Sequence, residues 1–97
     1  MVWDKWWTYS LGLVITDQDD FGVYELGDDN KNTVYYGSGR VKSRLLDHLN
    51  KQEYPAAKHY RIEYLESEEA ARAREEQLLR DYEGAHGTLP MYNQRTG

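Results

Sequence analysis

Two short segments rich in strand-forming side chains, separated by turn residues, constrain the fold of this chain most. Residues 21–26 read FGVYEL and residues 33–36 read TVYY, and both contain the β-branched and aromatic side chains that favour strands. Between them the sequence GDDNKN supplies glycine, aspartate and asparagine, which adopt turns readily. The sequence therefore predicts an antiparallel β-hairpin with a loop of moderate length.

The chain after this hairpin predicts a helix over residues 40–51. Apolar side chains recur every four residues there, which is the spacing of a buried helical stripe, at Val41, Leu45 and Leu49. Either Ser38 or Gly39 is expected to cap its start. The helix is expected to stop before Pro55, because proline cannot continue it.

A strand and a second helix are expected to follow. Residues 59–66 alternate between apolar and charged side chains, which is typical of a strand with one buried face. Ser67 is the predicted N-cap of a helix that runs to about Glu83, with Gly84 as the left-handed residue after it. The order of elements predicts an α+β domain with a small antiparallel sheet of about three strands.

Length and composition limit the possible classes of protein. With 97 residues the chain has room for one small domain, which we assign to residues 21–97. It contains no cysteine, which excludes disulfides and thiolate metal sites. The first residues lack the pattern of a secretory signal, and no apolar run reaches the length of a membrane span. We therefore expect a cytoplasmic protein, monomeric or weakly dimeric, that does not bind membranes.

Residues 1–20 form an aromatic-rich extension. Three tryptophans and a tyrosine lie within its first nine residues, at Trp3, Trp6, Trp7 and Tyr9. Because each would bury a large apolar area, we expect this cluster to pack against the domain and to be mostly buried. A dimer contact or a partner-binding surface is the alternative. Residues 11–15 (LGLVI) are expected to add a fourth strand.

Positive charge is concentrated in one block although the net charge is −5. Residues 40–61 contain six basic and two acidic residues. Such a block can contact phosphate locally, whereas the alternative is an ordinary solvated helix face. The candidates for nucleic-acid binding are Arg40, Lys42, Lys51 and Lys58.

The second helix places a carboxylate among apolar side chains. Glu75 lies four residues after Ala71 and three before Leu78, so it is expected on the inward face. A carboxylate there is costly unless it is paired or binds a metal. Glu76 is expected beside it, towards solvent.

Five features of the chain together resemble the GIY-YIG nuclease superfamily. The triplets Gly22–Tyr24 and Tyr35–Gly37 resemble the two motifs that give the family its name. Three further features follow in the family's order, namely Arg44 in the first helix, Glu75 in an E-x-x-L-L segment of the last helix and Asn93 near the end. The resemblance extends over residues 21–95 and implies a GIY-YIG-like fold and activity.

The resemblance implies hydrolysis of DNA phosphodiester bonds with one Mg²⁺ or Mn²⁺ ion, on structured, branched or damaged DNA, as in DNA repair. In this interpretation Glu75 binds the metal, Arg44 contacts phosphate and Tyr24 accepts the proton of the attacking water. Tyr35 and His48 are second candidates for holding the water or phosphate. All five side chains are expected to converge on one concave face.

The residue types agree with this chemistry. Mg²⁺ commonly uses one or two carboxylates together with water and substrate phosphate, and the planar fork of arginine matches a phosphate. Gly22 and Gly37 are expected to permit close backbone packing, and Asn93 to have a structural role. Glu76 fits an E-x-x-L-R variant of the helix motif, but we prefer Glu75 because of its inward face.

Two functions from different classes remain open at the level of sequence. The first is a metal-dependent endonuclease whose specificity a protein partner could supply, and the second is a non-catalytic module that binds nucleic acid or protein. The complete set of motif residues favours the enzyme. The negative net charge and the lack of room for a separate DNA-binding domain favour a weak or partner-dependent activity.

Overall fold

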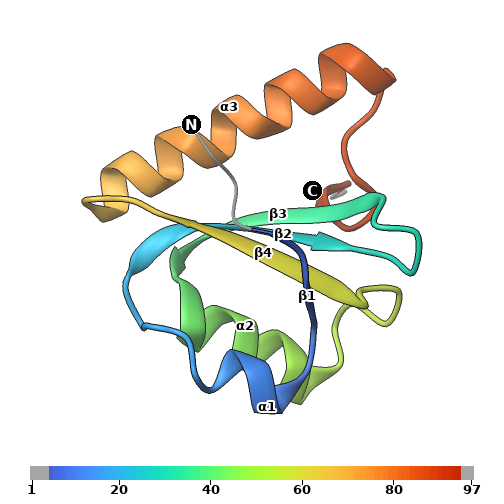
Figure 1. Cartoon of the computed structure of the whole chain (residues 1–97). Coiled ribbons are helices and arrows are strands. Elements are labelled where there is room, and N and C mark those ends of the chain that lie inside the picture. The colour runs from blue at the N-terminus through green and yellow to red at the C-terminus, as the bar shows by residue number, and fades with distance from the viewer. Residues whose placement is uncertain (1–4, 95–97) are drawn as a thin grey trace.

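A four-stranded antiparallel β-sheet runs through the centre of the computed structural model, which describes residues 5–94 (Figure 1). Its strands are β1 (Trp7–Thr8), β2 (Phe21–Gly27), β3 (Thr33–Arg40) and β4 (His59–Tyr64), in the spatial order β1-β4-β2-β3. This architecture confirms the predicted α+β class. The fourth strand comes from the N-terminal extension, as expected, but from residues 7–8 and not 11–15.

The predicted hairpin is formed by β2 and β3. Tyr24 lies opposite Gly37 in the register, and the register shifts at Leu26/Gly27. In the loop, the Asp28 carboxylate accepts hydrogen bonds from the backbone of Asn30 and Asn32, each at 2.9 Å. Aspartate therefore acts here as the turn former that the sequence indicated. β3 is an outer strand of the sheet, so one of its edges has no neighbouring strand within residues 5–94.

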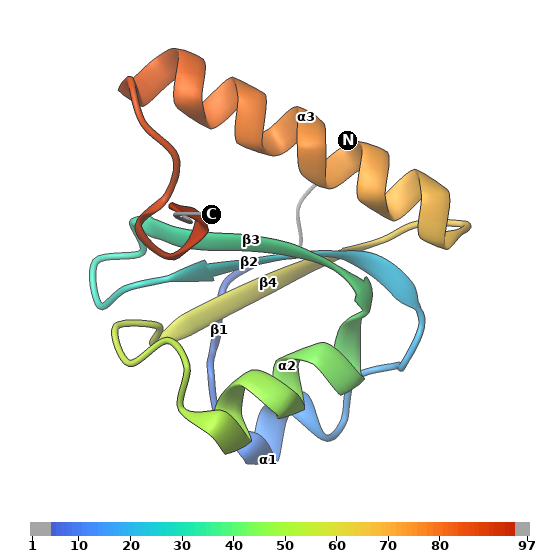
Figure 2. The same cartoon turned by 180° about the vertical axis from the view of Figure 1, so that it is seen from behind.

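Helices cover both faces of this sheet (Figures 1 and 2). Helices α1 (Leu11–Val14) and α2 (Val41–Lys51) lie on one face, and α3 (Glu68–His86) crosses the other. A short 3₁₀ helix, η1 (Met91–Asn93), follows α3 and lies beside β3. Of the helices in residues 5–94, none combines the length and apolar character needed to cross a membrane.

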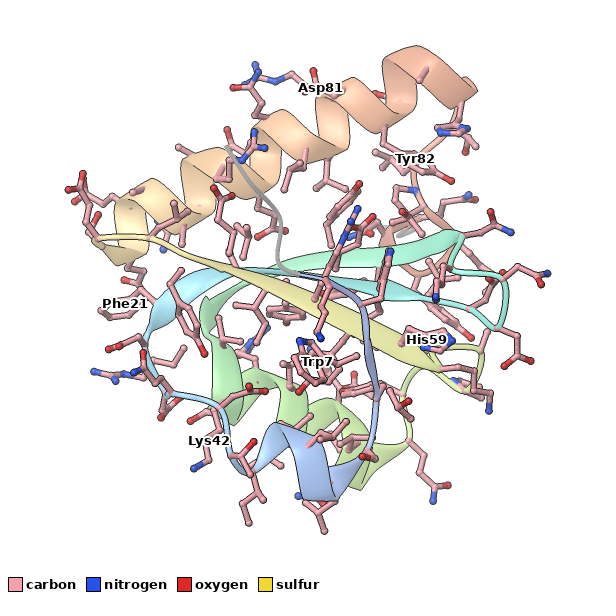
Figure 3. The ribbon with its side chains drawn as sticks, in the orientation of Figure 1. Trp7, Phe21, Lys42, His59, Asp81 and Tyr82 are labelled. Atoms are coloured by element: carbon pink, nitrogen blue, oxygen red, sulfur yellow. The ribbon has the colours of Figure 1, made fainter. Side chains whose placement is uncertain are left out.

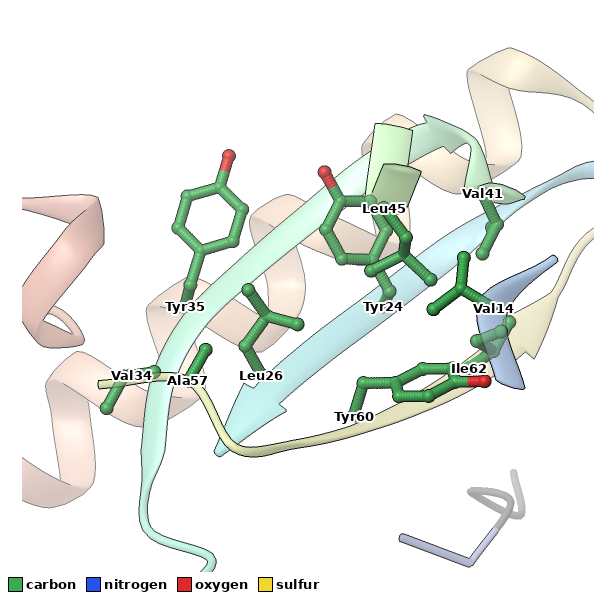
Figure 4. Packing of buried hydrophobic residues seen from close by; sticks show 10 residues of the cluster. All are labelled: Val14, Tyr24, Leu26, Val34, Tyr35, Val41, Leu45, Ala57, Tyr60 and Ile62. Atoms are coloured by element: carbon green, nitrogen blue, oxygen red, sulfur yellow. The ribbon is translucent and has the colours of Figure 1, made fainter. Parts of the chain in front are cut away.

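Each face of the sheet has its own hydrophobic core, because side chains alternate along every strand. The larger core, between the sheet and helices α1 and α2, is shown in Figure 4 and consists of Val14, Tyr24, Leu26, Val34, Tyr35, Val41, Leu45, Ala57, Tyr60 and Ile62. The smaller core lies under α3 and consists of Val23, Tyr36, Ala71 and Leu78. The two motif tyrosines, Tyr24 and Tyr35, therefore belong to the α2 face.

Helix α2 begins where it was predicted, but its cap comes from elsewhere in the chain. Neither Ser38 nor Gly39 caps it, since both lie within β3. The Asp19 carboxylate accepts hydrogen bonds from the Ser43 backbone at 3.0 Å and from the Ser43 hydroxyl at 2.8 Å. A carboxylate from the loop before β2 thus accepts a backbone N–H of the first turn of α2. Local sequence spacing does not reveal this cap.

Helix α3 begins at the predicted cap and ends later than predicted. The Ser67 hydroxyl accepts the Ala70 N–H at 3.0 Å. Gly84 lies within the helix, so its prediction as the end was wrong. Gly87 takes the left-handed conformation, with φ of 77°, and donates its N–H to Glu83. Two glycines three residues apart offer the same local signal, and the later one is used.

The N-terminal extension differs from its prediction in two respects. Residues 11–15 were expected as a strand, but Leu11–Val14 is a helix in which Val14 alone is fully buried. The aromatic cluster is only partly buried, since Trp6 is half-buried and Trp7 is 38% exposed. Trp3 lies outside the described residues. Trp6 still packs against the sheet, because it covers Gly27 and Arg61 lies 4.3 Å above its ring.

Candidate functional site

The two glycines of the motif triplets are required by close packing. A methyl group at Gly37 would lie 2.7 Å from Cε2 of Tyr24 and closer still to its hydroxyl. A methyl group at Gly22 would lie 2.5 Å from the Glu63 backbone oxygen. Real Cβ atoms do not approach other atoms this closely, so glycine permits both approaches. The Tyr24 ring occupies the space that a side chain at position 37 would fill.

Tyr24 is hydrogen-bonded to a buried histidine of α2. The Tyr24 hydroxyl lies 2.8 Å from His48 Nε2, and His48 Nδ1 lies 2.8 Å from a carboxylate oxygen of Glu53. His48 is 5% exposed, so it is not the surface histidine that its sequence position alone would allow. Because an ionised carboxylate accepts only, Nδ1 donates to Glu53, and a singly protonated His48 would then accept the hydrogen bond of the Tyr24 hydroxyl at Nε2.

Arg44, one turn before His48 in α2, also contacts Tyr24. Its guanidinium interacts with the Tyr24 hydroxyl, and its Cγ lies 3.4 Å from where a side chain would begin at Gly39. Burial raises the pKa of Tyr24 well above its ordinary value, and Tyr35 adds to this, whereas Arg44 acts in the opposite direction. The interaction with Tyr24 in turn raises the pKa of Arg44.

Tyr35 belongs to the same cluster of rings. Its ring centre is 6.1 Å from that of Tyr24, 5.7 Å from that of His48 and 4.6 Å from that of Tyr54, on which it stacks. Figure 4 shows the hydroxyls of Tyr24 and Tyr35 directed to the same side. Tyr24, Tyr35, Arg44 and His48 are thus brought together, as the sequence predicted.

Glu75 lies on the other face of the sheet, contrary to the expectation of one concave face. It belongs to α3, is half-buried, and accepts a hydrogen bond from the Ser38 hydroxyl. Ser38 faces α3, whereas its neighbours Gly37 and Gly39 face α2, because residues alternate along a strand. Glu75 therefore contacts Ser38 from the α3 face, whereas Arg44 lies beside Gly39 on the α2 face. The two side chains approach adjacent residues of β3, and only the strand itself lies between them.

The described residues offer a limited set of metal ligands. Within residues 5–94 no three histidine or acidic side chains gather where they could hold an ion. Glu75 is half-buried and uses one carboxylate oxygen for Ser38, whereas Glu76 is exposed. One carboxylate with a neighbouring hydroxyl fits a Mg²⁺ ion that keeps most of its waters and also binds substrate phosphate.

The predicted nucleic-acid-binding residues are distributed along the α2 side of the molecule. Arg40 donates to the Asp19 backbone and lies 5.0 Å above the Phe21 ring. Lys51 pairs with Asp47 at 3.1 Å, at the far end of α2. Lys42 occupies the first turn of α2, on the opposite side of the molecule from Asp81 of α3 (Figure 3). Lys58 lines a cavity of about 310 Å³ together with His48.

Asn93 protects the outer edge of β3. Its side-chain oxygen accepts the Tyr36 N–H at 2.9 Å, and its side-chain nitrogen donates to the Tyr36 carbonyl at 3.0 Å. The amide thereby takes the place of a neighbouring strand at this residue. This arrangement agrees with the structural role expected for Asn93.

Sequence reasoning missed two acidic residues. Glu53 carries no signal except its position five residues after His48. Glu25 is 1% exposed, pairs with Arg61 at 2.5 Å and is hydrogen-bonded by Thr33. Its position between Tyr24 and Leu26 in an apolar run was the available signal, because a charge there has to be paired. Burial, with Glu25 as the second cause, raises the pKa of the adjacent Tyr36 to about 12.

Comparison with known proteins identifies the family of the chain. A family model described as "Domain of unknown function (DUF7508)" matches residues 3–84. Because this match spans most of the sequence, the chain belongs to that family. The search of curated proteins found no match, and the search of solved structures found none either.

Proposed function

We propose that this member of the DUF7508 family is a metal-dependent endonuclease that hydrolyses phosphodiester bonds in DNA. The observation that supports this most is the group formed by Tyr24, His48 and Arg44, which adjoins a glycine-rich segment of β3 whose other side contacts Glu75. The motif resemblance to GIY-YIG nucleases is part of the proposal.

Arg44 is the group suited to hold the substrate phosphate. Its side chain is exposed on α2, and its charge lies beside the Tyr24 hydroxyl. A guanidinium presents two parallel N–H donors, so it can both orient a phosphate and stabilise the negative charge that grows on its oxygens during hydrolysis. Lysine would supply the charge without this geometry.

Tyr24 and His48 are suited to accept a proton. Hydrolysis requires a water molecule to lose a proton as it attacks phosphorus. The Tyr24 hydroxyl is hydrogen-bonded to Nε2 of His48. If the hydroxyl is the donor, Tyr24 can pass its own proton to His48 as it gains one from water. The positive charge of Arg44 favours the phenolate that this exchange needs.

Glu75 would hold the metal ion in this proposal. A bound Mg²⁺ would supply charge neutralisation at the phosphate and a stabilised leaving oxygen. The Ser38 hydroxyl holds one oxygen of Glu75 in place, which orients the carboxylate at the margin of the sheet. DNA would then lie along the exposed margin of β3, in contact with both faces. A DNA substrate also implies a location where DNA is present, and we propose the cytoplasm.

One observation favours a second candidate, a non-catalytic module that binds nucleic acid or a protein partner. Tyr24 is fully buried, and Glu75 belongs to α3, which covers the opposite face of the sheet (Figure 1). A catalytic tyrosine has to come within hydrogen-bond reach of its substrate, so activity would require an opening beside Tyr24. A binding module would use the exposed cations and need no such opening.

A nicking assay distinguishes the two candidates. Purified protein would be incubated with duplex, flap, junction and single-stranded DNA, with Mg²⁺, Mn²⁺ or a chelator. We expect metal-dependent cleavage of at least one branched substrate, lost in Arg44→Ala and Glu75→Gln and kept within a few fold in Glu76→Gln, the matched control. Because Glu75→Gln removes a negative charge near phosphate, DNA affinity should stay equal or rise.

Two results would change the conclusion. If Glu76→Gln abolishes cleavage and Glu75→Gln does not, the metal assignment is wrong. If the wild type cleaves no substrate with either metal but binds DNA, the binding module is the correct function.

A further inference from the structure

We propose that Glu53 is a positioning residue that holds His48 in the tautomer with the proton on Nδ1, so that Nε2 accepts the hydrogen bond of the Tyr24 hydroxyl. The inference deepens the proposed function, since it names the group that directs the proton of Tyr24. Its structural part, the tautomer, is independent of whether the protein cleaves DNA.

For a singly protonated His48, the geometry leaves one consistent arrangement of protons. Both ring nitrogens have partners at 2.8 Å, Glu53 on one side and Tyr24 on the other. An ionised carboxylate has no proton to donate, so Nδ1 has to be the donor. A neutral imidazole carries one proton, which leaves Nε2 as the acceptor for the tyrosine hydroxyl.

The chain places Glu53 by an unusual turn at the end of α2. Gln52 takes the left-handed conformation, with φ of 51°, and the Glu53 N–H bonds the His48 carbonyl at 3.2 Å. This reversal brings the Glu53 side chain back over the ring five residues earlier. Non-glycine residues rarely adopt this conformation, so the surrounding structure must stabilise it. The ring of Tyr54 lies 4.8 Å from that of His48 and closes the turn.

A proton shift produces alternating charges along a row of four side chains, namely Arg44, Tyr24, His48 and Glu53. Before the shift, Arg44 is positive, Tyr24 and His48 are neutral, and Glu53 is negative. When the O–H bond of Tyr24 breaks and an N–H bond forms at Nε2, Tyr24 becomes negative and His48 positive, with no change in total charge. The new charges on Tyr24 and His48 then each lie between two opposite charges, which offsets part of the cost that burial places on the Tyr24 phenolate.

The neighbours of His48 do not offer another acceptor for its Nδ1 proton. The titratable groups around His48 are Tyr24 from β2, Tyr35 from β3, Glu53 and Tyr54, with Arg44 behind Tyr24, and Tyr9 and Lys58 line the same cavity as His48. Glu53 is the one anion among them. Its side chain is 38% exposed and so reaches from the buried ring to solvent. Glu53 therefore connects the buried tyrosine with the outside through a single histidine.

The tautomer can be measured directly by nuclear magnetic resonance. Long-range ¹H–¹⁵N correlation spectra distinguish a protonated from an unprotonated ring nitrogen, and variants at His59 and His86 assign the His48 signals. We expect the Nδ1–H tautomer to be dominant for His48 in the wild type near neutral pH. In Glu53→Ala we expect a mixture of tautomers or the Nε2–H form. Glu66→Ala, which removes an exposed carboxylate, serves as the control and should leave the spectrum unchanged.

A kinetic measurement tests the consequence for catalysis. Single-turnover cleavage by Glu53→Ala should be slower by about 10- to 100-fold, as is common when the partner that orients a functional histidine is removed. DNA binding should be retained, because Glu53 does not contact the phosphate in this proposal. A rate within twofold of wild type would overturn the catalytic role of Glu53.

The two parts fail in different ways. If the wild type shows the Nε2–H tautomer, the inference is wrong whether or not the protein cleaves DNA. If the wild type is inactive but His48 has the Nδ1–H tautomer and loses it in Glu53→Ala, the positioning role stands and the proposed nuclease fails. Should Glu53→Ala not fold, the wild-type spectrum still decides the tautomer.

Discussion

Replacement of Gly37 by alanine tests the central packing of the site. The added methyl group would lie 2.7 Å from Cε2 of Tyr24, and Tyr24 is fully buried and cannot move into solvent. Residue 37 is not among the glycines with positive φ in the described chain, so alanine meets no backbone strain and the contact alone decides the outcome. Either the ring or the strand has to move.

The size of the effect follows from this overlap. Insertion of a methyl group into a packed core typically costs about 1–3 kcal/mol of unfolding free energy. For a domain of this size, 1 kcal/mol shifts the melting temperature by about 4–8 °C. We therefore expect Gly37→Ala to melt lower by about 4–24 °C, measured by differential scanning calorimetry or circular dichroism. The displaced ring should also lose its hydrogen bond to His48.

Gly84→Ala is the matched control with the opposite sign. Position 84 lies within α3, is exposed, and has no atom within 4 Å of the new methyl group. Alanine in a helix is favoured over glycine by about 1 kcal/mol, so this variant should melt higher than wild type. Equal melting temperatures for Gly37→Ala and wild type would refute the packing argument.

Three further predictions concern stability. Removal of the α2 cap in Asp19→Ala should lower the free energy of unfolding, measured in urea, by about 1 kcal/mol. The hydrogen bonds to Ser43 lower the pKa of Asp19, so its contribution to stability is present above the unfolded pKa and is lost as the pH falls through the folded pKa. A wild type with flat stability down to about pH 2 would contradict this. The pKa of Tyr36 is raised to about 12, so its contribution is complete below pH ~10 and declines between pH ~10 and that value, which tyrosinate absorbance and melting curves would detect together. Trp6→Ala should lower the unfolding free energy by about 1–2 kcal/mol because the ring covers Gly27 and is half-buried, whereas no change would mean that the ring is not held against the sheet.

Local patterns in the sequence were sufficient for the main elements. The hairpin, α2, β4 and the start of α3 each depend on signals within a few residues of one another, namely alternation, a four-residue apolar repeat and a serine cap. These signals report which side of an element is apolar, and such information is local. For the same reason Glu75 was placed correctly as more buried than Glu76.

The same local reasoning failed where a short segment carried an ambiguous signal. Residues 11–15 are apolar throughout, and a run of this length suits a strand or a helical turn equally well. Val14 packs into the larger core, between the sheet and helices α1 and α2, and this contact favours the helix. Gly84 and Gly87 both offered an end for α3, and the choice between them also depends on packing beyond the helix.

Tertiary structure alone decided how the site residues meet. Asp19 caps a helix more than twenty residues away, and Glu53 reaches His48 through a left-handed turn that no composition signal marks. The sequence predicted Arg44 and Glu75 as members of one site but could not tell that they approach β3 from opposite faces. That placement follows from the path of the chain across the sheet, because periodicity defines which side of a helix is buried and not which face of the sheet it covers.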